Sequence, residues 1–135
     1  MTDHEMRIRL AEAMGWTDLK PLSPCGRMRD LWGTEPAGWC YPVSLARTDI
    51  NAPDPLGYDD DAARLRAWCV GRGWMVILAC DEDGASATIL ETEPSGIGNW
   101  HVSPSIEPDP LRRERLALCR AVVQALEAIE AGGEA

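Results

Sequence analysis

The chain has 135 residues, of which 45% are apolar and 26% are charged, and its formal net charge is −9. This length and balance are typical of one globular domain and exclude a disordered chain. The acidic balance repels a phosphate backbone, so we expect no direct binding of nucleic acid. No basic segment leads into an apolar stretch at the N-terminus, and no run reaches the roughly 20 apolar residues of a membrane span. We therefore expect a soluble, cytoplasmic protein with a single domain over residues 1–135.

The cysteine and histidine residues, which are common metal ligands, are scattered along the chain. The five cysteines, an odd number, contain no C-x-x-C pair, which disfavours both a disulfide framework and a thiolate zinc site. They are Cys25, Cys40, Cys69, Cys80 and Cys119. His4 lies in the first turn of a predicted helix, where a solvated side chain is ordinary. We expect five reduced thiols, no metal and no cofactor.

The first predicted helix covers residues 2–14. Thr2 and Glu5 have the spacing of a capping box, and Gly15 ends the helix. Trp16 then folds back over the last turn as an apolar anchor.

Residues 17–57 contain six prolines, which exclude a long helix and predict a Pro/Gly-rich loop and edge-strand region. Two short extended segments are predicted inside it, Met28–Trp32 and Trp39–Val43. A second helix is predicted over residues 60–72, because the acidic run Asp59–Asp61 favours a helix start and Gly73 favours its end.

A hairpin is predicted over residues 74–91. Its first strand is the continuous apolar run Trp74–Cys80, and an acidic turn that ends in Gly84 leads to a second run, Ala85–Leu90. Such runs are typical of strands buried on both faces, which need helices above and below them. One more short strand is predicted within Asn99–Ser103.

The last helix is predicted over residues 110–131. Asp109 and Pro110 are a capping carboxylate and a proline at the first helical position. The apolar stripe that we expect to pack on the hairpin contains Leu116, Cys119, Val123 and Leu126. Together these elements predict the α+β class, as a three-layer α/β/α sandwich with a small, mainly antiparallel sheet and helices on both faces.

Three segments have the order and spacing of a known family. They are Ala11–Trp16, Thr48–Ala52 and Leu118–Leu126, which together span almost the whole chain. In these segments the chain resembles small phage proteins with the phage ABA sandwich domain. The resemblance implies an α/β/α sandwich encoded by a phage or prophage and supplies no catalytic residues. One departure is the segment Pro53–Tyr58, which separates the Thr-Asp-Ile stretch from the second helix.

Few residues carry a recognisable chemistry. His101 is the candidate for acid–base work near neutral pH, although a structural role is favoured for it. The glycines of Gly96-Ile97-Gly98 lack the third glycine and the strand-then-helix context of a dinucleotide loop. The arginines at positions 112, 113 and 115 could bind a phosphate, but a solvated helix face is favoured. No pair of carboxylates is placed across a substrate.

Aromatic and arginine side chains in the Pro/Gly-rich segments are the candidates for a contact surface, either with a protein or between subunits. These candidate binding residues are Trp32, Trp39, Tyr41, Arg27, Arg29 and Trp100.

The resemblance implies a phage-encoded protein, and by analogy with small phage proteins we expect a non-enzymatic accessory protein that binds a host protein, to block a host process or an antiviral defence. Two alternatives remain open. One is an oligomeric binder that sequesters a nucleotide-like immune signal between tryptophan and arginine side chains. The other is a small enzyme that uses His101. A homo-oligomer is compatible with each of them.

Overall fold

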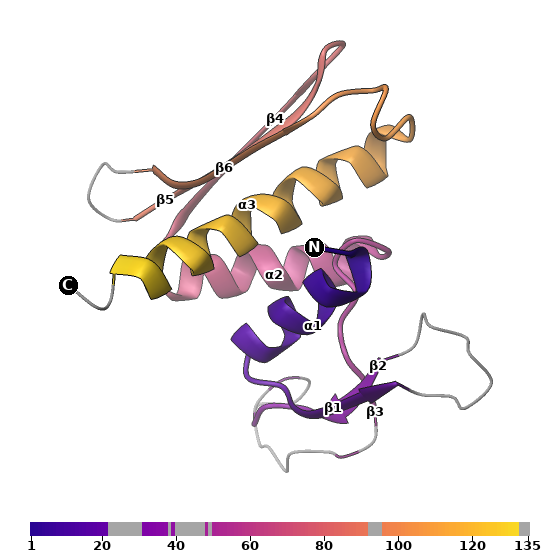
Figure 1. Ribbon diagram of the computed structural model, residues 1–135, viewed down its shortest axis with the longest axis vertical. Helices are drawn as coiled ribbons and strands as arrows, with labels where there is room; N and C mark the ends of the chain where they lie inside the picture. The colour runs from indigo at the N-terminus through magenta and orange to yellow at the C-terminus, as the bar shows by residue number, and fades with distance from the viewer. Residues whose placement is uncertain (22–30, 38, 40–47, 49, 92–95, 133–135) are drawn as a thin grey trace. The chain divides into compact units, whose positions relative to one another are not determined.

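The computed structural model describes residues 1–21, 31–37, 39, 48, 50–91 and 96–132. These residues form three helices and two three-stranded antiparallel sheets, so the predicted α+β class is confirmed (Figure 1). The elements are α1 (Asp3–Ala13), β1 (Thr17–Pro21), β2 (Leu31–Thr34), β3 (Ile50–Asn51), α2 (Asp59–Gly71), β4 (Met75–Asp81), β5 (Gly84–Leu90), β6 (Gly96–Val102) and α3 (Pro110–Gly132). The chain divides into two compact units, Met1–Pro53 and Asp54–Ala135.

In the first unit, helix α1 is one residue shorter at each end than the predicted range 2–14, and Thr2 is its N-cap as predicted. The amide of Glu5 donates to the hydroxyl of Thr2 over 3.1 Å. Gly15, with φ at +99°, terminates the helix in a conformation that glycine adopts freely. Trp16 follows with only 2% of its surface exposed, which confirms its predicted role as an apolar anchor.

The sheet of the first unit has the order β1-β2-β3. Strand β2 overlaps the predicted segment Met28–Trp32, but the prediction of an edge strand is wrong because β2 pairs with a neighbour on each side. Strand β1 was not predicted. Its pairing with β2 is irregular between Thr17 and Lys20, and Asp18 has a positive φ of 54°. Of the predicted segment Trp39–Val43, residues 40–43 lie outside the described residues.

In the second unit, the predicted hairpin is confirmed. Strands β4 and β5 pair from Met75 opposite Leu90 to Asp81 opposite Gly84, with a two-residue turn between them. Strand β6 pairs with the other side of β5 and begins three residues before the predicted segment Asn99–Ser103.

Burial on both faces of the hairpin, however, was a wrong prediction. Ala85, Ala87 and Ile89 of β5 are buried, whereas Met75 is 58% exposed and Ile77 is 45% exposed. The reason is that α3 lies against one face of the sheet and α2 lies on that same side (Figure 1). The opposite face has no covering element among the described residues of this unit.

Helix α3 agrees with the predicted range 110–131, and the side chain of Asp109 accepts from the amide of Leu111 over 3.1 Å. The residues of α3 that face β6 are not the predicted ones. A Cβ at Gly98 would collide with the carbonyl oxygen of Ala121 and would lie 3.1 Å from the amide nitrogen of Ala125. The amide of Asn99 donates to the side chain of Gln124 over 2.7 Å.

Small residues therefore let the backbones of α3 and β6 approach closely. The predicted packing stripe, which includes Cys119 and Val123, lies on the opposite side of the helix, because residues two positions apart on an α-helix point in nearly opposite directions. Cys119 and Val123 are also buried, so α3 is covered on both sides.

Helix α2 begins one residue before the predicted range 60–72. Its N-cap residue is Tyr58, whose side chain makes no capping hydrogen bond. The acidic first turn has another role: the carboxylate of Asp61 accepts from the amide of Asp54 over 2.8 Å. The segment Pro53–Tyr58 is thus tied to the helix that it precedes.

Candidate functional site

The uncovered face of the second sheet is the candidate site, and we call it the outer face. The strand register places nine side chains on it: Met75, Ile77, Ala79, Asp81, Ser86, Thr88, Leu90, Asn99 and His101. They alternate along each strand with the side chains that point toward α3. The outer face therefore belongs to a sheet whose opposite side is held by a packed helix, which makes it a rigid platform.

The outer face has an apolar end and a polar end. At the apolar end, Met75 lies opposite Leu90 and Ile77 lies opposite Thr88. At the polar end, the hydroxyl of Ser86 lies 2.8 Å from Nδ1 of His101, directly across the β5–β6 pair. Large exposed apolar side chains that are neighbours on a flat surface are typical of contact sites for other macromolecules.

The predicted catalytic candidate His101 lies at the polar end of this face. Its ring is hydrogen-bonded to Ser86, and the residue is exposed on the surface of a sheet. Among the described residues, no group of three or more His, Cys, Asp or Glu side chains could hold a metal ion.

The predicted binding residues are distributed over both units. Trp32 is half-buried in β2 of the first unit, and Trp39 is half-buried with its ring edge-on to that of Trp16 at 5.3 Å between centroids. Trp100 in β6 of the second unit is 40% exposed, and the guanidinium of Arg120 lies 5.8 Å from its ring centroid. Arg27, Arg29 and Tyr41 lie outside the described residues.

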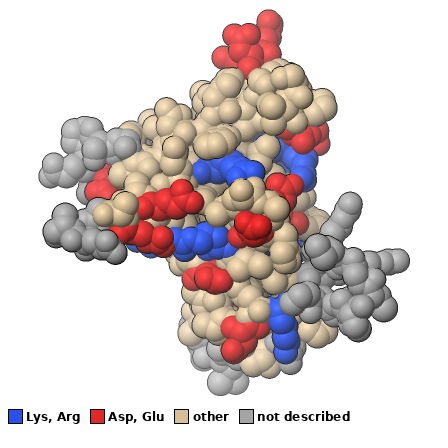
Figure 2. Space-filling view, viewed as in Figure 1, with Lys and Arg blue, Asp and Glu red and all other residues tan. Residues whose placement is uncertain are grey.

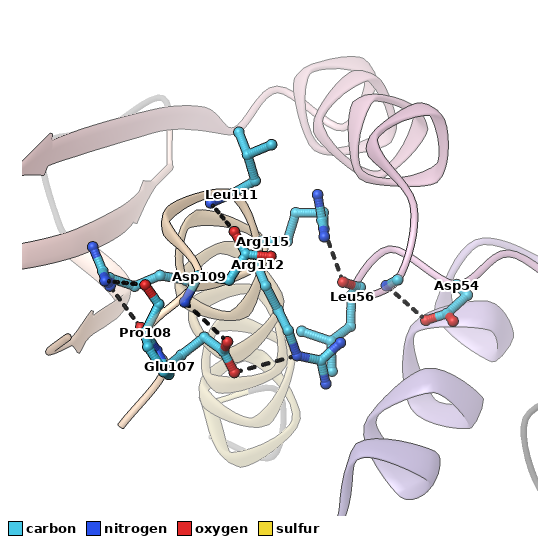
Figure 3. A network of polar contacts seen from close by, with 10 residues as sticks. Asp54, Leu56, Glu107, Pro108, Asp109, Leu111, Arg112 and Arg115 are labelled. Atoms are coloured by element: carbon cyan, nitrogen blue, oxygen red, sulfur yellow. Dashed lines mark hydrogen bonds and ion pairs between the residues drawn. The ribbon is translucent and has the colours of Figure 1, made fainter. Parts of the chain in front are cut away.

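The first two arginines of α3 hold the loop that precedes the helix (Figure 3). The guanidinium of Arg113, which is 9% exposed, donates to the carbonyl of Glu107 over 2.8 Å and to that of Pro108 over 2.9 Å. Arg112 forms an ion pair with the Glu107 carboxylate at 3.3 Å. The sequence had left two roles open for these arginines, a phosphate site and a solvated helix face. In the structure both side chains instead bind the loop that precedes α3.

Arg115 performs the same task for the segment Pro53–Tyr58. Its guanidinium donates to the carbonyl of Leu56 over 2.8 Å and pairs with Asp59 at 2.6 Å. Within the segment, Asp54 accepts from the amide of Gly57 over 3.1 Å (Figure 3). The segment Pro53–Tyr58 is therefore an ordered turn that is fixed to both α2 and α3.

A pocket of about 200 Å³ lies between α2, β4 and α3. Its lining residues are Asp59, Ala62, Arg66, Leu78, Leu111, Glu114, Arg115 and Leu118. No tryptophan lines it, so it does not match the predicted site of tryptophan and arginine side chains. Sites for drug-sized ligands usually measure about 300–1,000 Å³.

The described cysteines are free thiols. Cys69 and Cys119 are buried. Burial raises the pKa of Cys69 to about 12. Cys80 was predicted to be buried but is exposed, because α3 packs mainly on β5 and β6 and contacts β4 much less. Partial desolvation and then the carboxylate of Glu114 raise the pKa of Cys80, which disfavours a reactive thiolate.

Sequence reasoning missed the apolar end of the outer face, because it treated the run from Trp74 to Cys80 as buried on both sides. A weaker signal was present in the partner strand. Ser86 and Thr88 alternate with Ala85, Ala87 and Ile89, and this alternation is typical of a strand with one solvated face.

Comparison of the chain with protein-family models, curated proteins and solved structures finds no match. The resemblance to the phage ABA sandwich family therefore stays a prediction. No helix among the described residues combines the length and the apolar character needed to cross a membrane.

Proposed function

We propose that this protein is a non-enzymatic binding protein that docks on a partner protein through the outer face of its second sheet. The observation that carries the proposal is the exposure of Met75 and Ile77, at 58% and 45%, beside the half-buried Leu90. Fully burying one such side chain is worth roughly 1.5–3 kcal/mol, so a partner that covers the apolar end gains substantial free energy. Protein interfaces concentrate their binding energy in a few apolar side chains of this kind.

Charge supports a partner with basic residues. Asp81 at the end of β4 and the turn residues Glu82 and Asp83 are all exposed, and acidic side chains gather at the tip of this hairpin (Figure 2). The chain as a whole has a formal charge of −9. A partner that combines an apolar patch with a basic rim would be attracted over a long range and would be held by apolar contact.

The identity of the partner follows from the resemblance rather than from the geometry. If the chain is encoded by a phage, the partner is a bacterial host protein, and binding blocks a host process or an antiviral defence. This step is an analogy at the level of the fold family. Within the described part of the chain, the small-ligand alternative has less support, because the pocket between α2, β4 and α3 is smaller than the usual range for ligand sites.

The test is affinity capture from bacterial lysate with three baits: the native chain, Ile77→Ser, and the control Val70→Ser. Val70 is 63% exposed on α2, so the control removes a similar apolar side chain from a different surface. We expect a host protein that is retained by the native chain and by Val70→Ser but not by Ile77→Ser. Equal retention by all three baits would rule out the outer face as the docking surface.

A further inference from the structure

The free edge of strand β4 is the most unusual feature of the second unit. The sheet order is β4-β5-β6, so β4 pairs with β5 on one side, and no described residue pairs with its other side. The strand is seven residues long and contains no proline, lysine or arginine, and its one charged residue is Asp81. Natural edge strands usually carry such residues, or are short, because an open edge pairs with other chains.

The backbone groups at this edge can be derived from the hairpin. A two-residue turn is closed by a hydrogen-bonded pair, here Asp81 with Gly84, and hydrogen-bonded and open pairs then alternate along the ladder. The amide and carbonyl groups of Val76, Leu78 and Cys80 therefore point away from β5. They form a regular row of donors and acceptors along the free edge.

We infer that β4 pairs antiparallel with β4 of a second copy of this chain, with a twofold axis at Leu78. In this register each Val76 lies opposite Cys80 of the other copy, and the two Leu78 residues lie opposite each other. All three outward-pointing residues of each strand then form ladder hydrogen bonds. The result is one continuous six-stranded sheet, which leaves neither β4 as an edge.

Charge complementarity favours this antiparallel arrangement. It places the acidic turn Asp81–Asp83 of one copy beside the start of β4 in the other copy. Arg72 lies just before that start, exposed, with its guanidinium 4.6 Å from the ring centroid of Trp74. A parallel pairing would instead bring the two acidic turns together, where like charges repel.

The inference concerns the edge of the sheet and does not depend on what binds the outer face. In the dimer, Ile77 of one copy lies beside Ala79 of the other on the outer face, so the apolar surfaces of the two copies become continuous. Loss of the dimer and loss of partner binding can be told apart. A substitution on the outer face of the central strand β5 changes the surface for a partner but leaves the edge of β4 unchanged.

The first experiment measures the mass of the purified chain by light scattering during size-exclusion chromatography. We expect twice the chain's mass of 14.8 kDa for the native protein. Ile77→Lys places a charge at the edge and should weaken dimerisation at least tenfold. Thr88→Lys, directly opposite Ile77 but on the central strand, should leave the dimer intact.

Two outcomes contradict the inference. A native mass of one chain at about 100 µM would place the dissociation constant outside the range of specific complexes. A dimer that is lost in both Ile77→Lys and Thr88→Lys would be held by the outer face instead of the edge. Circular dichroism melting curves of both variants show whether either change unfolds the protein.

The second experiment tests the register. In the double variant Ile77→Cys/Ala79→Cys, each new cysteine lies opposite one in the other copy at an open pair of the ladder, where cross-strand disulfides form readily. Oxidation should then yield a covalent dimer that reductant dissolves. Both variants also carry Cys80→Ser, because the exposed native thiol could otherwise form the disulfide. A covalent dimer of Ile77→Cys/Cys80→Ser would overturn the register, because it would place Ile77 at the twofold axis.

Discussion

The two faces of the β4–β5–β6 sheet are formed by the same strands but have different surroundings. On the inner face, Ala85, Ala87 and Ile89 are buried beneath α3. On the outer face, Met75 and Ile77 are more than 40% exposed. Each face carries large apolar side chains, and only the face that α3 covers becomes core. An apolar run in the sequence indicates side chains that are stabilised by burial, but the surface that buries them can belong to another molecule.

The largest expected difference between the faces comes from truncating an isoleucine on each. Ile89→Ala on the inner face removes a fully buried side chain and should cost about 2–5 kcal/mol of unfolding free energy. Ile77→Ala on the outer face should cost under about 1 kcal/mol, because the side chain is 45% exposed. Urea unfolding of both variants measures the difference. Equal costs would mean that the outer face is covered as well.

The close contact of β6 with α3 gives the second prediction. Gly98→Ala forces a Cβ against the Ala121 carbonyl, which belongs to a helix backbone and cannot turn aside, and should cost about 1–3 kcal/mol. The control is Gly71→Ala in the last position of α2, where no atom lies within 4 Å of the new Cβ. That change should be neutral or stabilising by up to about 1 kcal/mol. Thermal unfolding distinguishes them, and a neutral Gly98→Ala would contradict the close packing.

The pH dependence of stability compares the Cys69 thiol in the folded protein with the same thiol in the unfolded chain. Burial raises the pKa of its thiol from 9.0 to about 12, so the folded protein holds this proton where the unfolded chain releases it. The contribution to stability is complete below pH 9 and decreases by about 1.4 kcal/mol per pH unit up to pH 12. Urea unfolding between these pH values should show a steeper decrease for the native chain than for Cys69→Ala. Parallel curves would contradict the burial of the thiol.

The smallest expected effect is a difference in the alkylation of exposed and buried cysteines. At pH 8 an alkylating reagent should label Cys80 in the folded protein, while Cys69 and Cys119 react only after unfolding. Peptide mass mapping identifies the labelled positions. Slow labelling of Cys80 that becomes fast in Ile77→Lys would connect its protection to the edge pairing of β4.

The positions of the helices were predictable because their ends carry local signals. Thr2, Asp109 and the glycines that follow α1 and α2 act within a few residues of the chain. Strand β1 was not predictable, because its irregular pairing and the positive φ of Asp18 depend on β2. Tertiary contacts of this kind leave no local pattern in the sequence.

The candidate site was harder to predict for the same reason. The strand sequence that predicted a hairpin does not state which face a helix covers. A solvated helix face was favoured for the arginines at positions 112, 113 and 115, but they bind carbonyl groups of neighbouring loops and the carboxylates of Glu107 and Asp59. Trp32, Trp39 and Trp100 were chosen for their Pro/Gly-rich surroundings, and their binding role stays a prediction.

The order of elements in the second unit has a consequence for synthesis on the ribosome. Strands β4, β5 and β6 are consecutive in the chain, so the sheet can form as soon as they emerge. Helix α3 follows them and adds 23 residues, which at about 5–20 residues per second take one or more seconds to make. During that interval the outer face and the inner face of β5 and β6, which α3 will cover, are open to water. A neighbouring nascent chain could then pair with β4 before the helix has closed the inner face.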